Sequence, residues 1–181
     1  MRSTKISFRV FQAASLLGLC AAAATTFASE VAEIKRIGVP GSTFPISLTV
    51  SVPADSRITF VSGTLAEVAN PDAPKGSIEA YGNTQTQTTS ILNVIAKRLA
   101  ATGLTLADVV KVNVFLVGDP KLGGKMDFDG LNAAYSQFFG SPNQPNKPVR
   151  TALQVMALPM PGALLEIEAT AAKVSELPAA K

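Results

Sequence analysis

The sequence predicts an α+β domain in which one mixed β-sheet carries two helices on one face. Apolar residues alternate with polar ones in several short segments, which is typical of half-buried strands. Two longer segments repeat apolar residues at intervals of three and four, which indicates amphipathic helices. These elements follow one another in the order ββαβαββ, with no linker or internal repeat, and this order favours the α+β class.

The segment before this domain, residues 1–28, has the three parts of a secretory signal peptide. Arg2, Lys5 and Arg9 give it a positive start, a short apolar run follows, and Ala28 ends a stretch suited to cleavage. Because the apolar run is shorter than the roughly 20 residues of a membrane-spanning helix, we expect cleavage rather than an uncleaved anchor.

Cleavage after Ala28 leaves a single domain over residues 29–181, with its core at about residues 40–173. We expect this domain to be periplasmic or secreted, with no stable membrane association. Three of the chain's 16 basic residues lie in the signal peptide, so the domain keeps 13 basic residues against 13 acidic ones. A neutral domain without a basic cluster argues against nucleic acid as a partner.

The inventory of reactive side chains excludes several classes of enzyme. The chain has no histidine, and its single cysteine, Cys20, lies in the predicted signal peptide. The mature domain therefore has no disulfide, no Ser-His-Asp triad and no zinc site built from histidine or cysteine. Its chemistry must use arginine, lysine, carboxylates, hydroxyls, amides and backbone groups.

The first half of the domain predicts a hairpin, a loop and a helix. Residues 46–52 alternate, with the even-numbered apolar side chains on one face, and residues 57–61 are β-branched or aromatic. The turn residues between these two strands predict a β-hairpin. A loop covers residues 64–83, and the apolar repeat of residues 84–101 predicts a helix that Gly103 caps.

The second half of the domain predicts a strand, a helix and two further strands. Residues 110–116 alternate and form a central strand, and residues 126–139 form the second helix. Residues 150–157 and 164–172 are the final strands, joined directly by residues 158–162. Because two helices cover only one face of such a sheet, we expect self-association to cover the other face.

Two charged candidates lie in the last strands, and each also has a plain structural interpretation. Arg150 follows the stiff Pro148 and can offer its planar fork to a carboxylate, although many such residues are only solvated charges. Glu166 and Glu168 share one face of the last strand. One of them can act as a general base on water, unless both are simply solvated.

Three further candidates carry no charge. Asn132, on the second predicted helix, offers an amide for hydrogen bonding, and Phe44, in an irregular lead-in over residues 29–45, can cover a pocket. The pair Ser62-Gly63 follows a strand and can offer backbone N–H groups. Taken alone, such an asparagine more often faces water, such a phenylalanine can simply fill the core, and such a Ser-Gly pair more often only turns the chain.

Taken together, the motifs of this chain resemble those of the Rid (YjgF-type) imine deaminase family over about residues 40–173. In order along the chain, the motifs are Phe60-Val61-Ser62-Gly63, Asp108-Val109-Val110-Lys111, Val114-Phe115-Leu116, Met126-Asp127-Phe128 with Asn132, Tyr135 and Phe138-Phe139, Pro148-Val149-Arg150-Thr151, and Leu165-Glu166-Ile167-Glu168-Ala169. The last two are the most specific, because they match a P-A-R-S-like turn followed by an E-I-E-type strand.

The resemblance implies a chorismate-mutase-like α+β fold and a homotrimer with clefts between its subunits. It also implies hydrolysis of enamines and imines of amino acids to 2-oxo acids and ammonia, without a cofactor or a metal. In this pattern Arg150 pairs with the carboxylate of a small imino acid, and Glu166 positions or activates water. The remaining residues that match the substrate pocket are Asn132, Phe44, Ser62 and Gly63.

Two departures from the family pattern keep a second function open. Val149 replaces the alanine of the P-A-R-S-like turn, and Phe44 stands near a position where many members have a tyrosine. The alternative to a deaminase is therefore a non-enzymatic trimer that binds small carboxylates in the periplasm. A ribonuclease, an activity sometimes attached to the family's name, is disfavoured by the neutral domain and by the export signal.

Overall fold

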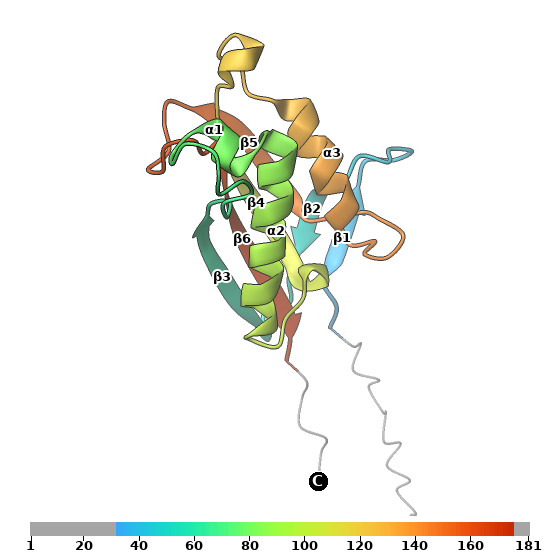
Figure 1. Ribbon diagram of the computed structural model, residues 1–181. Coiled ribbons are helices and arrows are strands. Elements are labelled where there is room, and N and C mark those ends of the chain that lie inside the picture. The colour runs from blue at the N-terminus through green and yellow to red at the C-terminus, as the bar shows by residue number, and fades with distance from the viewer. Residues whose placement is uncertain (1–31, 176–181) are drawn as a thin grey trace, which may run out of the picture. The chain divides into compact units, whose positions relative to one another are not determined.

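The computed structural model describes residues 32–175, which are built around one four-stranded sheet (Figure 1). The predicted signal peptide, residues 1–28, and the end of the chain, residues 176–181, lie outside the described residues. Export, cleavage and the domain boundary at residue 29 therefore remain predictions. Within the described part, no helix is long and apolar enough to cross a membrane.

The order of the elements agrees with the predicted pattern and adds one strand and several short helices. The elements are β1 (Lys35–Gly38), β2 (Ser47–Ser51), β3 (Ser56–Thr64), α1 (Ile78–Tyr81), α2 (Thr84–Ala100), η1 (Leu106–Asp108), β4 (Val109–Val117), η2 (Pro120–Leu122), α3 (Phe128–Phe138), β5 (Val149–Val155) and β6 (Leu165–Val174), where η1 and η2 are 3₁₀ helices.

The main sheet has the strand order β3-β6-β4-β5. Strands β4 and β5 are parallel, and the other neighbours are antiparallel, so the predicted mixed sheet is confirmed. The strand predicted to be central, β4, does lie in the interior of the sheet. Its alternate residues Val112, Val114 and Leu116 are buried, while the residues between them are half-exposed or exposed.

Helices α2 and α3 cover one face of this sheet, as the sequence predicts (Figure 1). Gly103, at a φ of 72°, caps α2 as expected, and its N–H donates to the carbonyl of Ala100 at 3.0 Å. The core between helices and sheet contains Ile91, Leu92, Ile95 and Leu99 from α2, Leu131 and Tyr135 from α3, and Val112, Val114, Leu116, Leu165 and Ile167 from the sheet.

The predicted hairpin between residues 46–52 and 57–61 is wrong. Strand β2 pairs with β1, which lies in the segment expected to be irregular, and β3 pairs with β6. Alternation suggested a buried apolar face for residues 46–52, yet Leu48 is exposed and Ser47 is buried. The physical reason is that β2 lies beside β5, where the N–H of Ser47 donates to the carbonyl of Pro148 at 2.9 Å.

The last two strands are not direct neighbours either, because β4 lies between β5 and β6. Strand β5 runs parallel to β4 and β6 runs antiparallel to it, so β5 ends and β6 begins at the same end of the sheet, and the connection between them crosses the end of β4. Burial explains why β6 takes the interior place. Its residues on the helix face are all buried (Leu165, Ile167, Ala169 and Ala171), whereas β5 is half-exposed, as an edge strand of this sheet.

The predicted loop over residues 64–83 contains helix α1 and is held by one buried side chain, Gln87 of α2. Its Nε2 donates to the carbonyls of Gly82 at 2.9 Å and Gly162 at 3.0 Å. Its Oε1 accepts from the backbone N–H of Leu164 at 2.9 Å. This amide therefore joins the end of the loop, the connection between β5 and β6, and the first turn of α2.

We expect Gln87→Leu to lower the free energy of unfolding by about 3 kcal/mol or more. Three backbone groups would lose their hydrogen-bond partner, and each buried group left unpaired costs about 1–3 kcal/mol. Urea unfolding measures this change. Gln85→Leu, on an exposed position of the same helix, is the matched control and should change stability by less than about 0.5 kcal/mol. Equal stabilities of the two variants would contradict the structural role of Gln87.

Candidate functional site

Arg150 lies on β5 with its side chain on the helix-covered face of the sheet. In the register of β4 with β5 it is opposite Val112, whose side chain is buried under the helices. Its Nη2 donates to Oδ1 of Asn132 on α3 at 2.8 Å. Two residues predicted for the site are therefore in direct contact. A hydrogen bond that involves a charged group contributes about 1.5–3 kcal/mol.

Three aromatic rings surround this guanidinium group. The ring of Tyr135 is nearest, with its centre 4.4 Å from Cζ of Arg150. The rings of Phe44 and Phe128 follow at 5.4 Å and 5.6 Å. Ring faces attract cations by about 0.5–2 kcal/mol. We call these residues, with Asn132, the arginine cluster.

The arginine cluster contains no anion. Within residues 32–175, Asn132 is the side chain that accepts a hydrogen bond from Arg150, and no carboxylate forms an ion pair with it. Burial lowers the pKa of Arg150, and the phenol of Tyr135 partly opposes this shift. The Nη1 atom is buried and has no hydrogen-bond partner. A partly buried cation with a buried, unused donor is costly unless an anion balances its charge, so this arrangement is suited to receive a carboxylate.

Two local features of the sequence bring the arginine cluster together. Phe128, Asn132 and Tyr135 follow one another at intervals of four and three residues, which places them on one face of α3. The loop that carries Phe44 is held at the start of β5 by Ser47, which follows it in the sequence. The hydroxyl of Ser47 donates to a backbone carbonyl just before β5, at 2.6 Å.

The other predicted site residues, Ser62, Gly63 and Glu166, lie on strands β3 and β6. The pairing of these strands changes register between Val61 and Thr64, at an irregularity in β3. There the carboxylate of Glu166 lies directly over Gly63, and a Cβ atom on Gly63 would overlap Oε1 of Glu166. A side chain at position 63 would therefore displace this carboxylate, which the glycine leaves in place.

Arg150 and Glu166 point to opposite faces of the sheet. Arg150 is opposite Val112 in β4, and Glu166 is opposite Phe115. Val112 and Phe115 are three residues apart on one strand, so their side chains point to opposite sides. A single chain therefore forms two separate groups, the arginine cluster on the helix face and Glu166 with Ser62 and Gly63 on the open face.

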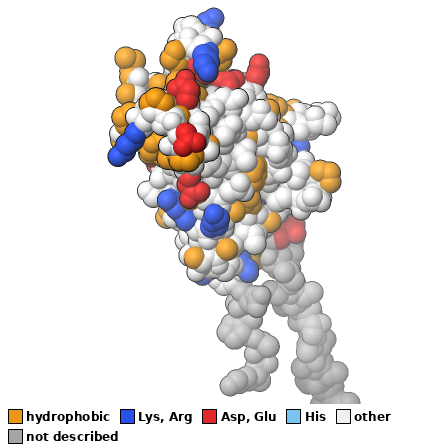
Figure 2. All heavy atoms as spheres, viewed as in Figure 1, with side chains coloured by type: hydrophobic (Ala, Val, Ile, Leu, Met, Phe, Trp, Pro, Cys, Tyr) orange, Lys and Arg blue, Asp and Glu red, His pale blue; other side chains and the backbone are white. Residues whose placement is uncertain are grey.

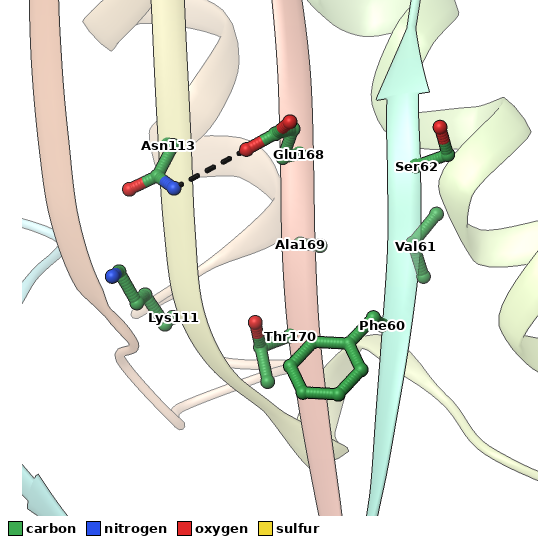
Figure 3. A pocket seen from close by; sticks show the side chains of 8 residues that line it. All are labelled: Phe60, Val61, Ser62, Lys111, Asn113, Glu168, Ala169 and Thr170. Carbon is green, nitrogen blue, oxygen red and sulfur yellow. Dashed lines mark hydrogen bonds between the residues drawn. The ribbon is translucent and has the colours of Figure 1, made fainter.

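The open face also has a shallow hollow of about 310 Å³ (Figure 3). Asn113 and Glu168 point toward each other across it, and Nδ2 of Asn113 donates to Oε2 of Glu168 at 3.4 Å. Phe60, at one side of the hollow, is 79 % exposed. The strand register places Ile58 and Leu153, which are also exposed, on the same face. Large apolar side chains gathered on an uncovered sheet face fit the expectation that another molecule covers it.

Sequence reasoning missed the roles of Tyr135 and Phe128, which the apolar repeat identified only as helix residues. The signal was present in the spacing, because both lie on the same helix face as Asn132. The spacing of the helix residues does not show that Arg150 lies opposite this helix face. Among the described residues, no three histidine, cysteine, aspartate or glutamate side chains come together as metal ligands.

Known proteins with related sequences agree with this architecture. The chain matches the family described as Endoribonuclease L-PSP over residues 46–173. It is 35% identical over 114 residues to a RutC family protein of Pyrococcus horikoshii. The aligned segment covers 63% of this chain and 78% of the other protein. The chain belongs to the Rid/YjgF family.

Two further similar proteins extend the match. Protein DfrA of Myxococcus xanthus is 33% identical over 133 residues, which is 73% of this chain and 88% of that protein. The solved structure of the Rid family protein YyfB from Yersinia pestis is similar with a TM-score of 0.57 and 25% identity, and it covers 76% of this chain and 97% of the other. The family and the chorismate-mutase-like fold expected from the motifs are thereby confirmed.

The close approach of Glu166 to Gly63 leads to a prediction about stability. We expect Gly63→Ala to lower the free energy of unfolding by about 1 kcal/mol, because the new Cβ atom forces the carboxylate at the end of the Glu166 side chain to move aside. In a chain that already carries Glu166→Ala, the same substitution should cost much less. Urea unfolding of the single and double variants measures both effects.

Gly38→Ala is the matched control, because nothing lies within 4 Å of the Cβ atom that it would add. It should change stability by less than about 0.5 kcal/mol. A cost of Gly63→Ala that stays the same with and without the Glu166 side chain would contradict the close approach.

The buried phenol of Tyr135 leads to a prediction about how stability depends on pH. Burial raises its pKa above the ordinary value of 10.0, although the charge of Arg150 opposes this shift. The folded chain therefore keeps a proton that the unfolded chain releases above pH 10, so stability falls as the pH rises further, by about 1.4 kcal/mol per pH unit for this group. Denaturant unfolding at alkaline pH should show a smaller fall for Tyr135→Phe than for the wild type. Equal slopes would contradict the burial of an ionisable phenol.

Proposed function

We propose that the protein is a cofactor-independent deaminase that hydrolyses 2-imino acids and their enamine tautomers to 2-oxo acids and ammonia. The observation that carries this proposal is the guanidinium of Arg150, which is buried among aromatic rings without an anion and keeps Nη1 unpaired. Membership of a family generally linked to imine and enamine deamination supports it.

In the proposed reaction Arg150 binds the carboxylate of the substrate. The planar guanidinium can hold a carboxylate through two parallel hydrogen bonds, which fixes the orientation of the adjoining imine carbon. Asn132 accepts from Nη2 at 2.8 Å and so keeps the guanidinium in place while Nη1 remains for the ligand. The surrounding rings exclude water from the ion pair, which strengthens it.

Glu166 supplies the base for the attacking water. Its carboxylate accepts a proton as the water oxygen adds to the imine carbon, and the imine nitrogen is protonated in turn. Cleavage of the C–N bond in this adduct then gives the 2-oxo acid and ammonia. An imine is already electrophilic, so orientation, one water and a proton acceptor suffice, and no histidine or cysteine is required.

We place the reaction between two copies of the chain in a homotrimer, because Arg150 and Glu166 point to opposite faces of one sheet. In this arrangement the arginine cluster of one copy lies opposite Glu166 of the next. The exposed apolar residues Ile58, Phe60 and Leu153 on the face of Glu166 support its cover by another copy. The predicted signal peptide would place the trimer in the periplasm or outside the cell.

A small carboxylate fits these observations better than RNA does, although the family's description names an endoribonuclease. The predicted mature domain is neutral. On the helix-covered face, positive and negative side chains are interspersed and form no extended basic surface (Figure 2). A nucleic-acid site normally needs such a surface to bind the phosphate backbone.

A non-enzymatic carboxylate-binding protein is the second candidate, and Phe44 favours it. The ring of Phe44 lies 5.4 Å from Cζ of Arg150 and brings no hydroxyl for proton transfer to the arginine cluster. A binder of this kind would hold small 2-oxo acids through Arg150 without turning over imino acids. The two candidates differ only in whether hydrolysis follows binding.

The proposed activity is tested with an imino acid generated in the assay by an amino-acid oxidase. We expect the wild type to accelerate formation of the 2-oxo acid over buffer alone. Arg150→Ala should lower kcat/KM by about 100-fold or more, because it removes the carboxylate ion pair, and Glu166→Gln should lower kcat by about 10²–10⁴-fold.

Arg57→Ala is a matched control, because this exposed arginine lies at the start of β3 and donates to the carbonyl of Thr102. It should leave the rate unchanged. No acceleration by the wild type, together with binding of 2-oxo acids in calorimetry, would replace the deaminase by the carboxylate-binding protein. Activity that survives Arg150→Ala would contradict both.

A further inference from the structure

A second buried polar atom without a partner lies in the arginine cluster. Tyr135 is fully buried, and its hydroxyl oxygen Oη, like Nη1 of Arg150, has no hydrogen-bond partner. Buried polar groups in folded proteins nearly always have a partner, so two unpaired donors in one cluster call for a common explanation. The deaminase proposed above uses only Arg150 of this pair.

The two groups lie close enough to influence each other. The guanidinium carbon of Arg150 is 4.4 Å from the ring centre of Tyr135, and the charge of Arg150 lowers the pKa of this phenol against the larger effect of burial. Because burial keeps the phenol protonated, Oη remains a donor at neutral and mildly alkaline pH. Two neighbouring donors are satisfied together by one acceptor group with several lone pairs, and a carboxylate is such a group.

We propose that Tyr135 is a ligand-binding residue, whose hydroxyl and Nη1 of Arg150 together hold the carboxylate of the ligand. The inference rests on the proposed carboxylate site at Arg150, but it does not depend on hydrolysis. It assigns the cluster a ligand with a free carboxylate, because an amide or ester has too little negative charge to balance the buried guanidinium.

Ligand binding requires one of the outer rings to move, because Nη1 and Oη are both closed off from solvent. Phe44 and Phe128 are the exposed rings of the cluster, each with 37% of its surface accessible. Phe44 lies on the connection between β1 and β2, outside any helix or strand. Displacement of its ring would open the two donors without disturbing the fully buried Tyr135.

An internal water is the competing explanation, since a water molecule could also accept from both donors. The two explanations differ in what Tyr135→Phe changes. If the hydroxyl binds the ligand, its removal weakens the ligand and leaves the free protein as stable as before, because the hydroxyl has no protein partner. If the hydroxyl only holds a water, its removal leaves ligand affinity unchanged.

Calorimetric titration of the full chain with 2-oxobutanoate tests the inference, with the neutral 2-oxobutanamide as a second probe. We expect the wild type to bind 2-oxobutanoate and not the amide, and Tyr135→Phe to bind it about tenfold more weakly with an unchanged thermal unfolding midpoint. Tyr81→Phe is the matched control, because it removes the hydroxyl of the chain's other tyrosine, which lies in α1. This variant should bind like the wild type.

The outcomes separate the inference from the function on which it rests. No binding of 2-oxobutanoate by the wild type contradicts the carboxylate site itself, and with it the proposed function. Binding by the wild type with equal affinity in Tyr135→Phe leaves the carboxylate site in place and overturns the role of Tyr135. Equal binding of the amide and the acid overturns the requirement for a free carboxylate.

Discussion

The buried guanidinium of Arg150 is the feature around which the functional part of this structure is organised. The fold holds this cation among three aromatic rings, with one amide as its polar partner. Removing a positive charge from water costs free energy, and a bound anion would offset that cost. The spacing of α3 supplies Asn132 and Tyr135, and the small sheet of β1 and β2 brings Phe44 to the same place. These contacts orient the guanidinium in advance, which would reduce the entropy lost when the proposed carboxylate binds.

The alternation of a β-sheet imposes the second constraint. Arg150 and Glu166 lie on strands that flank β4 on either side, and their positions along it differ by an odd number of residues. No change of side-chain rotamer can bring a helix-face residue and an open-face residue into one site. A reaction that uses both groups must therefore combine two copies, and the exposed apolar residues on the open face supply a surface for that contact. Strand register thus links oligomerisation to the proposed catalysis.

The parts of the fold that the sequence predicted are those in which one element's pattern decides its environment. Strand β4 and helices α2 and α3 each have a regular apolar period, and Gly103 ends α2 for a purely local reason. The predicted hairpin was wrong because pairing depends on partners far away in the sequence, and a strand such as β2 can alternate without burying its apolar face.

The candidate site was likewise predicted only in part. Arg150, Asn132 and Phe44 come together, and so do Ser62, Gly63 and Glu166, but the motifs did not reveal that the two groups face opposite ways. That separation depends on the register of three strands. The proposed role of Tyr135 was also hidden, because a buried tyrosine in a helix looks like a core residue until its hydroxyl proves to have no partner.

The most direct test of a site shared between copies is complementation. Arg150→Ala and Glu166→Gln chains, each inactive alone, are unfolded together, refolded as a mixture and assayed for imine hydrolysis. Random assembly of symmetric trimers gives about a quarter of the sites an intact arginine from one copy and an intact glutamate from the next, so we predict recovery of about a quarter of the wild-type rate. A mixture that remains as inactive as its two components, although mixed trimers have formed, would contradict the shared site.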